Sequence, residues 1–304
     1  MPGRGAHDAL GATSLETRIM QEMTTMSAAS DSADASTRFY RHVLETLHAA
    51  GLPFLVGGAY AFSACTGISR DTKDLDLFIR REDLPAASAA MQRVGYETEL
   101  TFPHWLAKVR TNGDMVDLIF NSGNGLAKVD DLWFQHAIPA AVLGVEVSLA
   151  PVEETLWSKA FVMERERYDG ADVAHLILAR APMMDWPRLL QRFGPHWRVL
   201  LSHLIMFGFI YPAQEDLVPG WLMEELLRRL REEKAAGTGE RVCAGTLLSR
   251  EQYLSDIDAG RYRDARQLPP CTMTDSDIAQ WTEAIQHRDE EQHSQTRIVA
   301  GPQQ

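Results

Sequence analysis

The sequence is poor in cysteine, in long apolar runs and in positive charge. Its three cysteines, at positions 65, 243 and 271, are too few and too widely spaced for a disulfide framework or a zinc site. The longest apolar run, residues 199–211, contains a histidine and is too short to span a bilayer. The N-terminus lacks the apolar segment of a secretory signal. These absences lead us to expect a cytoplasmic protein with no membrane segment.

The shortage of positive charge restricts the expected partners. The chain of 304 residues carries a formal net charge of −12. Broad, sequence-independent binding to nucleic acid requires a basic surface, so we do not expect it. A local basic patch around a site is still compatible with this charge. A content of 45% hydrophobic and 24% charged residues indicates a globular protein that can bury a core.

The order of helical and strand patterns predicts an α+β fold, in which a mixed sheet flanked by helices is followed by a helical C-terminal unit. The leader and the tail of the chain are polar and lack apolar periodicity, which is typical of disordered segments. The predicted units are a disordered leader (1–35), an α/β unit (36–150), a helical unit (151–231), a linker with C-terminal helices (232–287) and a disordered tail (288–304).

Apolar spacing places the secondary structure within these units. Helices are predicted over residues 37–50, 84–94, 131–137, 152–165, 171–179, 186–193, 196–209, 221–231, 250–259 and 275–287. Strands are predicted over 54–56, 74–79, 96–102, 105–111 and 115–120, with a strand pair in 142–149 that Gly144 interrupts. The Asn112-Gly113 dipeptide predicts a hairpin turn before the strand at 115–120.

Two aspartates and a glycine pair mark the first two strands. The apolar strand at 54–56 stops at Gly57-Gly58, and strand pattern resumes at Asp74. Because side chains alternate along a strand, Asp74 and Asp76 should project from the same face. Two adjacent carboxylates repel each other unless a cation or a proton lies between them. A glycine pair lets a bulky anion approach the backbone closely. The stretch therefore predicts a site for metal and phosphate.

A third acid, Asp117, extends this site. In the strand at 115–120 the apolar Val116 and Leu118 share one face, so Asp117 projects from the other. If this strand pairs beside the strand at 74–79, opposed side chains lie about 4.5–5.5 Å apart. Three converging carboxylates suit two divalent cations, which are typically about 3.5–4 Å apart. Two Mg²⁺ ions fit best, because all the protein ligands are oxygen.

The glycine pair, the two aspartates of one strand and the later Asp117 together resemble the nucleotidyltransferase superfamily, which has the DNA polymerase β-like fold. The sequence RDTKDLDL at 70–77 resembles small bacterial members, including antibiotic nucleotidyltransferases and toxin nucleotidyltransferases of the AbiEii type. The similar motifs cover residues 54–120, with a weaker similarity as far as residue 172. The connector between the glycine pair and the first aspartate is longer than is usual in the family.

This resemblance implies a reaction and assigns residues 36–150 as the catalytic domain. An acceptor hydroxyl would attack the α-phosphorus of a nucleoside triphosphate and release pyrophosphate. Asp74 and Asp76 would hold both metal ions. Asp117 would bind the metal that lowers the pKa of the acceptor hydroxyl, and it is a candidate to take the proton. The backbone of Gly57 and Gly58 would face the triphosphate, although a glycine pair alone is equally consistent with a tight strand-to-helix turn.

Further candidates lie on either side of the acids. Small members of the family often place a lysine that reaches the triphosphate where this chain has Lys159; the alternative is a surface lysine on an amphipathic helix. Arg70, Thr72 and Lys73 could neutralise phosphate or the acids, and the alternative is an exposed polar turn.

The sequence near residue 170 resembles an Arg and Asp-x-x-Asp element of the toxin-like members. For Asp169 we favour an N-cap of the following helix, and the role of Asp172 stays open. Trp105, Trp133 and Trp157 could stack on a base, but we favour core packing for them.

The predicted function is a Mg²⁺-dependent nucleotidyltransferase that uses an NTP, with ATP as one candidate. The alternative is a non-catalytic module of the same fold that binds a nucleotide or a partner protein. The acceptor is a small molecule or a tRNA. A tRNA acceptor predicts a basic groove beside the acids, whereas a polycationic antibiotic predicts an acidic pocket.

Overall fold

The computed structural model describes residues 34–70, 72, 74–111, 113–236 and 241–284. Most of the predicted leader, the whole predicted tail and Lys73 lie outside these residues. Among the described residues, no helix combines the length and the apolar character needed to cross a membrane.

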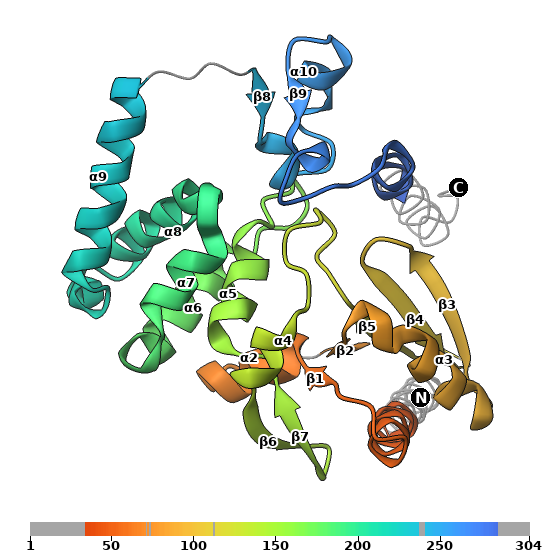
Figure 1. The fold of residues 1–304 in the computed structure, drawn as a ribbon. Coiled ribbons are helices and arrows are strands. Elements are labelled where there is room, and N and C mark those ends of the chain that lie inside the picture. The colour runs from red at the N-terminus through yellow and green to blue at the C-terminus, as the bar shows by residue number, and fades with distance from the viewer. Residues whose placement is uncertain (1–33, 71, 73, 112, 237–240, 285–304) are drawn as a thin grey trace, which may run out of the picture.

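A mixed sheet of seven strands forms the centre of the N-terminal part (Figure 1). Its spatial order is β3 (Glu97–Phe102), β4 (Leu106–Arg110), β5 (Met115–Ile119), β2 (Asp74–Phe78), β1 (Leu55–Val56), β7 (Val145–Leu149) and β6 (Ile138–Val142). β2 runs parallel to β5, and β1 runs parallel to β7. The other neighbours are antiparallel. The fold is α+β, as predicted.

One face of the sheet is sealed by apolar packing. Leu75 and Leu77 of β2 are fully buried, because alternation points them away from the acids of the same strand. They pack in one cluster with residues of the helix over 34–49 and of α3 (Leu84–Arg93), such as Leu44 and Met91. This packing fixes which face of β2 carries its two aspartates.

The helical part of the chain packs onto the other face of the sheet through a second apolar cluster. The helices, in order, are α2 (Gly58–Thr66), α4 (Asp131–Gln135), α5 (Val152–Ala160), α6 (Gly170–Arg180), α7 (Trp186–Phe193), α8 (Trp197–Ile210), α9 (Gly220–Ala236), α10 (Leu254–Asp258) and a helix over 275–284. The cluster joins Phe62 of α2 and Trp133 of α4 to Leu156 of α5 and Leu226 of α9. The two parts of the chain thus share a core.

The remaining elements are short. Two-residue strands β8 (Val242–Cys243) and β9 (Arg263–Asp264) form a small parallel sheet that the sequence did not predict. The 3₁₀ turns lie at Arg81–Asp83, Ala181–Met183, Gly194–His196, Pro212–Leu217, Gly245–Leu247 and Ala265–Gln267.

Several predicted boundaries were wrong. α5 ends at Ala160 and not at residue 165, because the chain turns back through a bridge between Met163 and Tyr168. α9 continues to Ala236, so the first residues predicted as linker are helical. β6 begins at Ile138, earlier than predicted; it lies at the edge of the sheet, where Pro139 is tolerated.

Candidate active site

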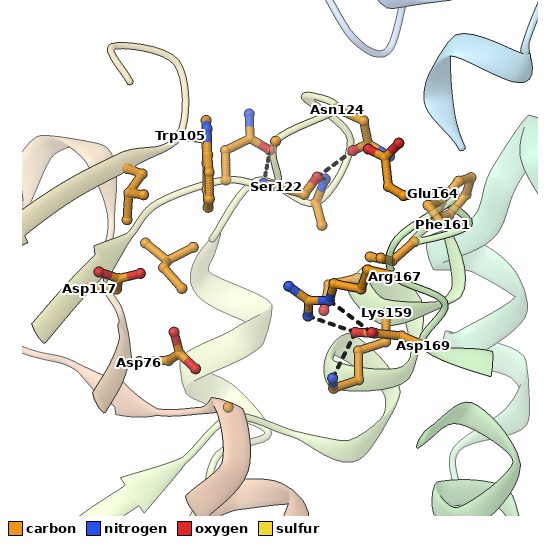
Figure 2. A pocket seen from close by; sticks show the side chains of 18 of the residues that line it. Asp76, Trp105, Asp117, Ser122, Asn124, Lys159, Phe161, Glu164, Arg167 and Asp169 are labelled. Carbon is orange, nitrogen blue, oxygen red and sulfur yellow. Dashed lines mark hydrogen bonds and ion pairs between the residues drawn. The ribbon is translucent and has the colours of Figure 1, made fainter. Parts of the chain in front are cut away.

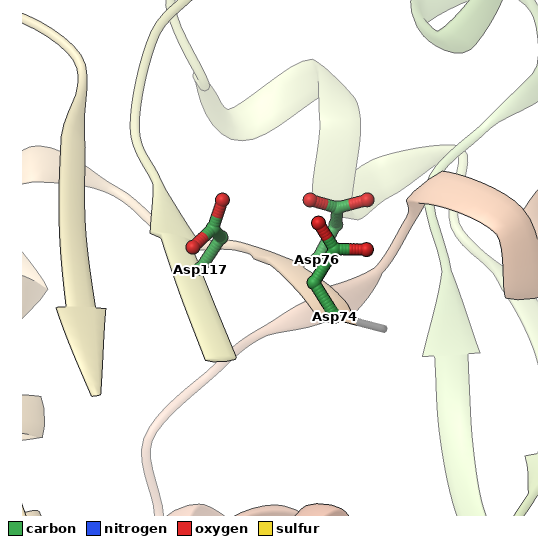
Figure 3. Close-up of side chains that lie close together, drawn as sticks. All are labelled: Asp74, Asp76 and Asp117. Carbon is green, nitrogen blue, oxygen red and sulfur yellow. The ribbon is translucent and has the colours of Figure 1, made fainter. Parts of the chain in front are cut away.

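Three carboxylates converge at the centre of the sheet, as Figure 3 shows. Asp76 of β2 lies directly opposite Asp117 of β5 in the parallel register, and Asp74 precedes Asp76 by two residues on the same strand. One carboxylate oxygen from each residue lies within 4.8 Å of the other two. The strand pairing that the sequence argument required is therefore present.

The electrostatics of this cluster favour a cation. Burial and, after it, the charges of Asp74 and Asp117 raise the pKa of Asp76 to about 7. Burial also raises the pKa of Asp117, although Lys108 opposes this with a hydrogen bond of 2.7 Å. The donor set consists of oxygen alone, which suits Mg²⁺. A divalent cation among these oxygens would offset both the cost of burial and the mutual repulsion that raise the pKa of Asp76.

Neighbouring groups position these carboxylates. The Thr72 hydroxyl donates to Asp74 Oδ1 at 2.6 Å. The Gly57 amide donates to the Asp76 carbonyl at 2.9 Å. Gly58 has a φ of +53°, and a Cβ there would overlap the Asp76 carboxylate. Gly57 packs against the Phe78 ring, whereas Gly58 lines the pocket described next.

The acids open into a pocket of about 610 Å³, which is in the usual range for small-molecule sites. Figure 2 shows Asp76 and Asp117 on one side of it, with Lys159, Arg167 and Asp169 across from them. The pocket thus has an acidic side on the sheet and an opposite side, on α5 and the loop before α6, that carries cations.

Lys159 lies inside this pocket and not on an exposed face. Its side chain is 16% exposed, and its ammonium group donates to Asp169 at 2.9 Å and to Asp172 at 2.8 Å. Arg167 adds a two-pronged hydrogen bond to Asp169, and Arg70 pairs with Asp172 at 2.5 Å. Three cations and two carboxylates therefore form one network.

The N-cap interpretation of Asp169 was wrong. Asp169 occupies the N-cap position of α6, but its side chain makes no capping hydrogen bond. The carboxylate binds Lys159 and Arg167 instead, because hydrogen bonds to charged donors are stronger than those to backbone amides. Burial alone would raise the pKa of Asp169 and Asp172. The neighbouring cations outweigh burial and hold both pKa values below the ordinary range.

The predicted polar turn before β2 is divided between two roles. Arg70 lies over the Phe62 ring at 4.4 Å and pairs with Asp172, so it faces the cationic side of the pocket. Thr72 holds Asp74 and lines the pocket as well. Both positions lie beside the site, while Lys73 is outside the described residues.

Comparison with protein families shows to which family the chain belongs. A family model described as uncharacterised nucleotidyltransferase matches residues 10–196, more than half of the chain. The chain is a member of this nucleotidyltransferase family. A search of the curated proteins finds no match.

Solved structures with a similar chain trace include further nucleotidyltransferases. The antibiotic-resistance factor ANT(2'')-Ia is 18% identical, with 67% of this chain and 95% of that chain covered and a TM-score of 0.34. The lincosamide antibiotic adenylyltransferase LnuA, in its lincomycin-bound structure, is 14% identical and has a TM-score of 0.34. The match covers 46% of this chain and 94% of that chain. An antigenic nucleotidyltransferase-like protein from Paracoccidioides brasiliensis is 16% identical and has a TM-score of 0.38. The match covers 60% of this chain and 92% of that chain. Likeness at this level carries no conclusion about substrates.

Sequence reasoning missed several residues of the nucleotidyltransferase pocket. Lys108 lies opposite Asp117 across the β4–β5 pair, and the alternation of β4 could have indicated it. Arg167 belongs to the segment that resembles the Arg and Asp-x-x-Asp element, but it was given no role of its own. Trp105 was favoured as a core residue but lines the pocket, unlike the buried Trp133 and Trp157. Trp281 and Arg250 also line the pocket, and no local pattern connects them to the acids.

Proposed function

We propose that this nucleotidyltransferase moves a nucleoside monophosphate from an NTP to the hydroxyl of a small-molecule acceptor and releases pyrophosphate. The observation that carries this proposal is the register of β2 and β5, which sets Asp76 opposite Asp117 with Asp74 beside them. A protein that only binds a nucleotide or a partner would gain nothing from three carboxylates that repel one another. ATP is the first nucleotide to test.

The three acids would hold two Mg²⁺ ions. Asp74 and Asp76 would contact both ions, and Asp117 would contact the one nearer the acceptor. When bound, the ions supply neutralising charge for the triphosphate and lower the pKa of the acceptor hydroxyl. Asp117 is the candidate to take the proton from that hydroxyl. The acceptor oxygen then bonds to the α-phosphorus, the bond from that phosphorus to the bridging oxygen breaks, and pyrophosphate leaves.

The opposite side of the pocket suits the triphosphate. Lys159, Arg167 and Arg70 supply positive charge there, and Gly58, beside Asp76, presents its backbone to the pocket without a side chain. Their network with Asp169 and Asp172 sets the positions of these cations before a nucleotide arrives. Preset donors stabilise developing charge without reorganisation during the reaction. Gly57, behind Gly58, contributes by holding the backbone of Asp76.

A small acceptor fits the described lining better than tRNA. The cations that line the pocket are Arg70, Lys108, Lys159, Arg167 and Arg250, and each is already paired with a carboxylate. The described residues therefore do not form a basic groove of unpaired charge beside the acids, which a tRNA acceptor would call for.

The test is the Asp76→Asn variant. It should keep the fold and lose Mg²⁺-dependent pyrophosphate release, because a neutral amide cannot supply the negative charge with which Asp76 would hold the ions. Asp131→Asn is the matched control, since Asp131 is 74% exposed on α4 and pairs only at the surface with Arg80. Undiminished pyrophosphate release from Asp76→Asn would overturn the proposal. Calorimetric titration with ATP and Mg²⁺ tests the alternative, a non-catalytic binding module. Tight binding without turnover would favour that module.

A further inference from the structure

A segment near the C-terminus forms one side of the pocket, through residues 246–250 and Trp281. Asn124 Nδ2, on the loop after β5, donates to the Leu247 carbonyl at 2.7 Å. On the opposite rim, Ser249 and Arg250 bind Glu164 at 2.7 Å and 3.0 Å. We call residues 245–250 together with the helix over 275–284 the pocket roof. These bonds anchor residues 247–250 of the roof to both rims, so this segment forms part of the pocket wall.

The roof also brings an aromatic ring to the pocket. Trp281 packs closely on the loop after β5, since a Cβ added at Gly123 would overlap its ring. It stands nearly perpendicular to Phe102 and Trp105, with ring centroids 5.1 Å and 5.0 Å away. Phe102 and Trp105 are stacked on each other at 5.7 Å. All three rings line the pocket, and we call them the aromatic wall.

The aromatic wall lies on the Asp117 side. Ile119 follows Asp117 on the same face of β5, and Leu106 pairs with Ile119 from β4. These two apolar residues line the pocket between Asp117 and the aromatic wall. Figure 2 shows Trp105 on the side of Asp117, across from Lys159 and Arg167. If Asp117 serves the acceptor hydroxyl, the aromatic wall contacts the acceptor and not the triphosphate.

The charges beside the wall argue against a polycation. Glu164 and Glu166 are both paired with Arg250, at 3.0 Å and 3.2 Å. Asp169 and Asp172 are paired in the lysine network described above. Outside the three catalytic acids, every carboxylate that lines the described pocket therefore has a cationic partner. A polycationic acceptor would have to break these pairs to find its own.

Two buried donors are left over at the same place. Arg250 is 6% exposed, and its Nη1 has no hydrogen-bond partner among the described residues. The indole Nε1 of Trp105 is likewise buried and unpartnered within the described part of the chain. Buried donors without partners cost free energy, so an oxygen of a ligand that reached them would be bound favourably.

We propose that the aromatic wall and Arg250 form the acceptor subsite, which takes a small molecule that carries an aromatic ring, a hydroxyl group and no multiple positive charge. This inference rests on the proposed function. Phe102 and Trp105 lie within the family match, whereas the roof that adds Trp281 and Arg250 lies beyond residue 196, where that match ends.

The test measures binding to the full-length protein in Mg²⁺ and α,β-methylene-ATP, which cannot release pyrophosphate. The probe is 2-(2-naphthyl)ethanol, and its binding is measured by equilibrium dialysis. Tobramycin is the polycationic comparison. Trp281→Ala should weaken naphthylethanol binding about tenfold or more, which is the scale of one stacking contact. Trp281→Phe should restore most of the affinity. Trp221→Ala is the matched control, because Trp221 is 47% exposed on α9 and should leave binding unchanged.

Gly123→Ala gives an independent route, since its methyl group displaces the Trp281 ring without removing it; it too should weaken the probe. Nucleotide affinity should stay the same in all four variants. The inference is overturned if the wild-type protein fails to bind naphthylethanol, or if Trp281→Ala and Gly123→Ala bind it normally. It is also overturned if the variants lose affinity for the nucleotide as much as for the probe, or if tobramycin competes with the probe for the subsite. Failure of wild type to bind the nucleotide with Mg²⁺ is a different result, because it overturns the proposed function itself.

Discussion

Glycines with left-handed backbones occupy the first position of helix α2 and the position directly after its last residue, and the two make a matched pair for mutagenesis. Gly58 has φ of +53° and Gly67 has φ of +75°. A Cβ at Gly67 meets nothing within 4 Å, whereas a Cβ at Gly58 would overlap the Asp76 carboxylate. Replacing each by Ala therefore separates backbone strain from collision with the proposed metal ligand.

The magnitudes follow from these two terms. A left-handed Ala costs about 1–2 kcal/mol, and this should be the whole loss of stability in Gly67→Ala. Overpacking adds about 1–3 kcal/mol, so Gly58→Ala should lose about 2–5 kcal/mol if Asp76 keeps its position. If Asp76 rotates away instead, the stability loss shrinks toward that of Gly67→Ala. If Asp76 rotates, the three carboxylates no longer meet; if it stays, the added methyl group crowds the carboxylate that would hold the metal ions.

Urea unfolding and a Mg²⁺ titration of pyrophosphate release measure the two effects. Gly67→Ala should be less stable but should keep its dependence on Mg²⁺. Gly58→Ala should require far more Mg²⁺ or release no pyrophosphate at any concentration. The reasoning is refuted if Gly58→Ala responds to Mg²⁺ as Gly67→Ala does, since the collision would then not reach Asp76.

Three further substitutions probe the rest of the molecule. Arg188→Met should lower the free energy of unfolding by about 3–5 kcal/mol in urea, because Arg188 pairs with the fully buried Glu154. Lys159→Met should weaken ATP binding about tenfold or more in calorimetry, on the scale of a lost charged hydrogen bond. Burial lowers the pKa of His203 from its ordinary 6.5, so the unfolded chain binds that proton more readily and stability is lost as the pH falls below 6.5. His203→Gln should make urea stability less dependent on pH in that acidic range.

Each of these has a matched control among exposed residues. Arg228→Met removes only exposed ion pairs on α9 and should change stability little. Lys128→Met removes an exposed lysine outside the pocket and should leave ATP affinity intact. His136→Gln replaces an exposed histidine and should keep the pH dependence of wild type. A control that matches its test variant would contradict the corresponding assignment.

The acids could be predicted from the sequence because alternation along a strand is a local property. Leu75 and Leu77 must be buried, which leaves Asp74 and Asp76 on the open face. The same argument held for Asp117, whose neighbours Val116 and Leu118 are fully buried. The pairing of the two strands was a conditional step, and the register of β2 and β5 confirmed it.

The cationic side of the pocket was predicted only in part. Helical spacing placed Lys159 on α5, but spacing does not say which carboxylates it meets across the pocket. The cap assignment of Asp169 failed because two cations from other positions compete with the backbone for its carboxylate. Competition of this kind is settled by tertiary contacts, which a local pattern does not contain.

The helix of the pocket roof was predicted, but its position over the pocket was not. Trp281 and Arg250 reach the pocket from the far end of the chain, and their neighbours in sequence are those of ordinary surface helices. What places them is the anchoring of Leu247 to Asn124 and of Arg250 to Glu164. Such long-range pairs appear only when the whole chain is folded.

The most direct measurement follows the fate of a labelled phosphate. The protein is incubated with Mg²⁺ and with each NTP, labelled in either the α- or the γ-phosphate, together with a panel of hydroxyl-bearing metabolites and RNAs. Nucleotidyl transfer predicts that the α-label moves to a small acceptor and that the γ-label leaves as pyrophosphate, with both lost in Asp76→Asn. Transfer of the γ-label to the acceptor, or α-label transfer that survives in Asp76→Asn, would contradict the account.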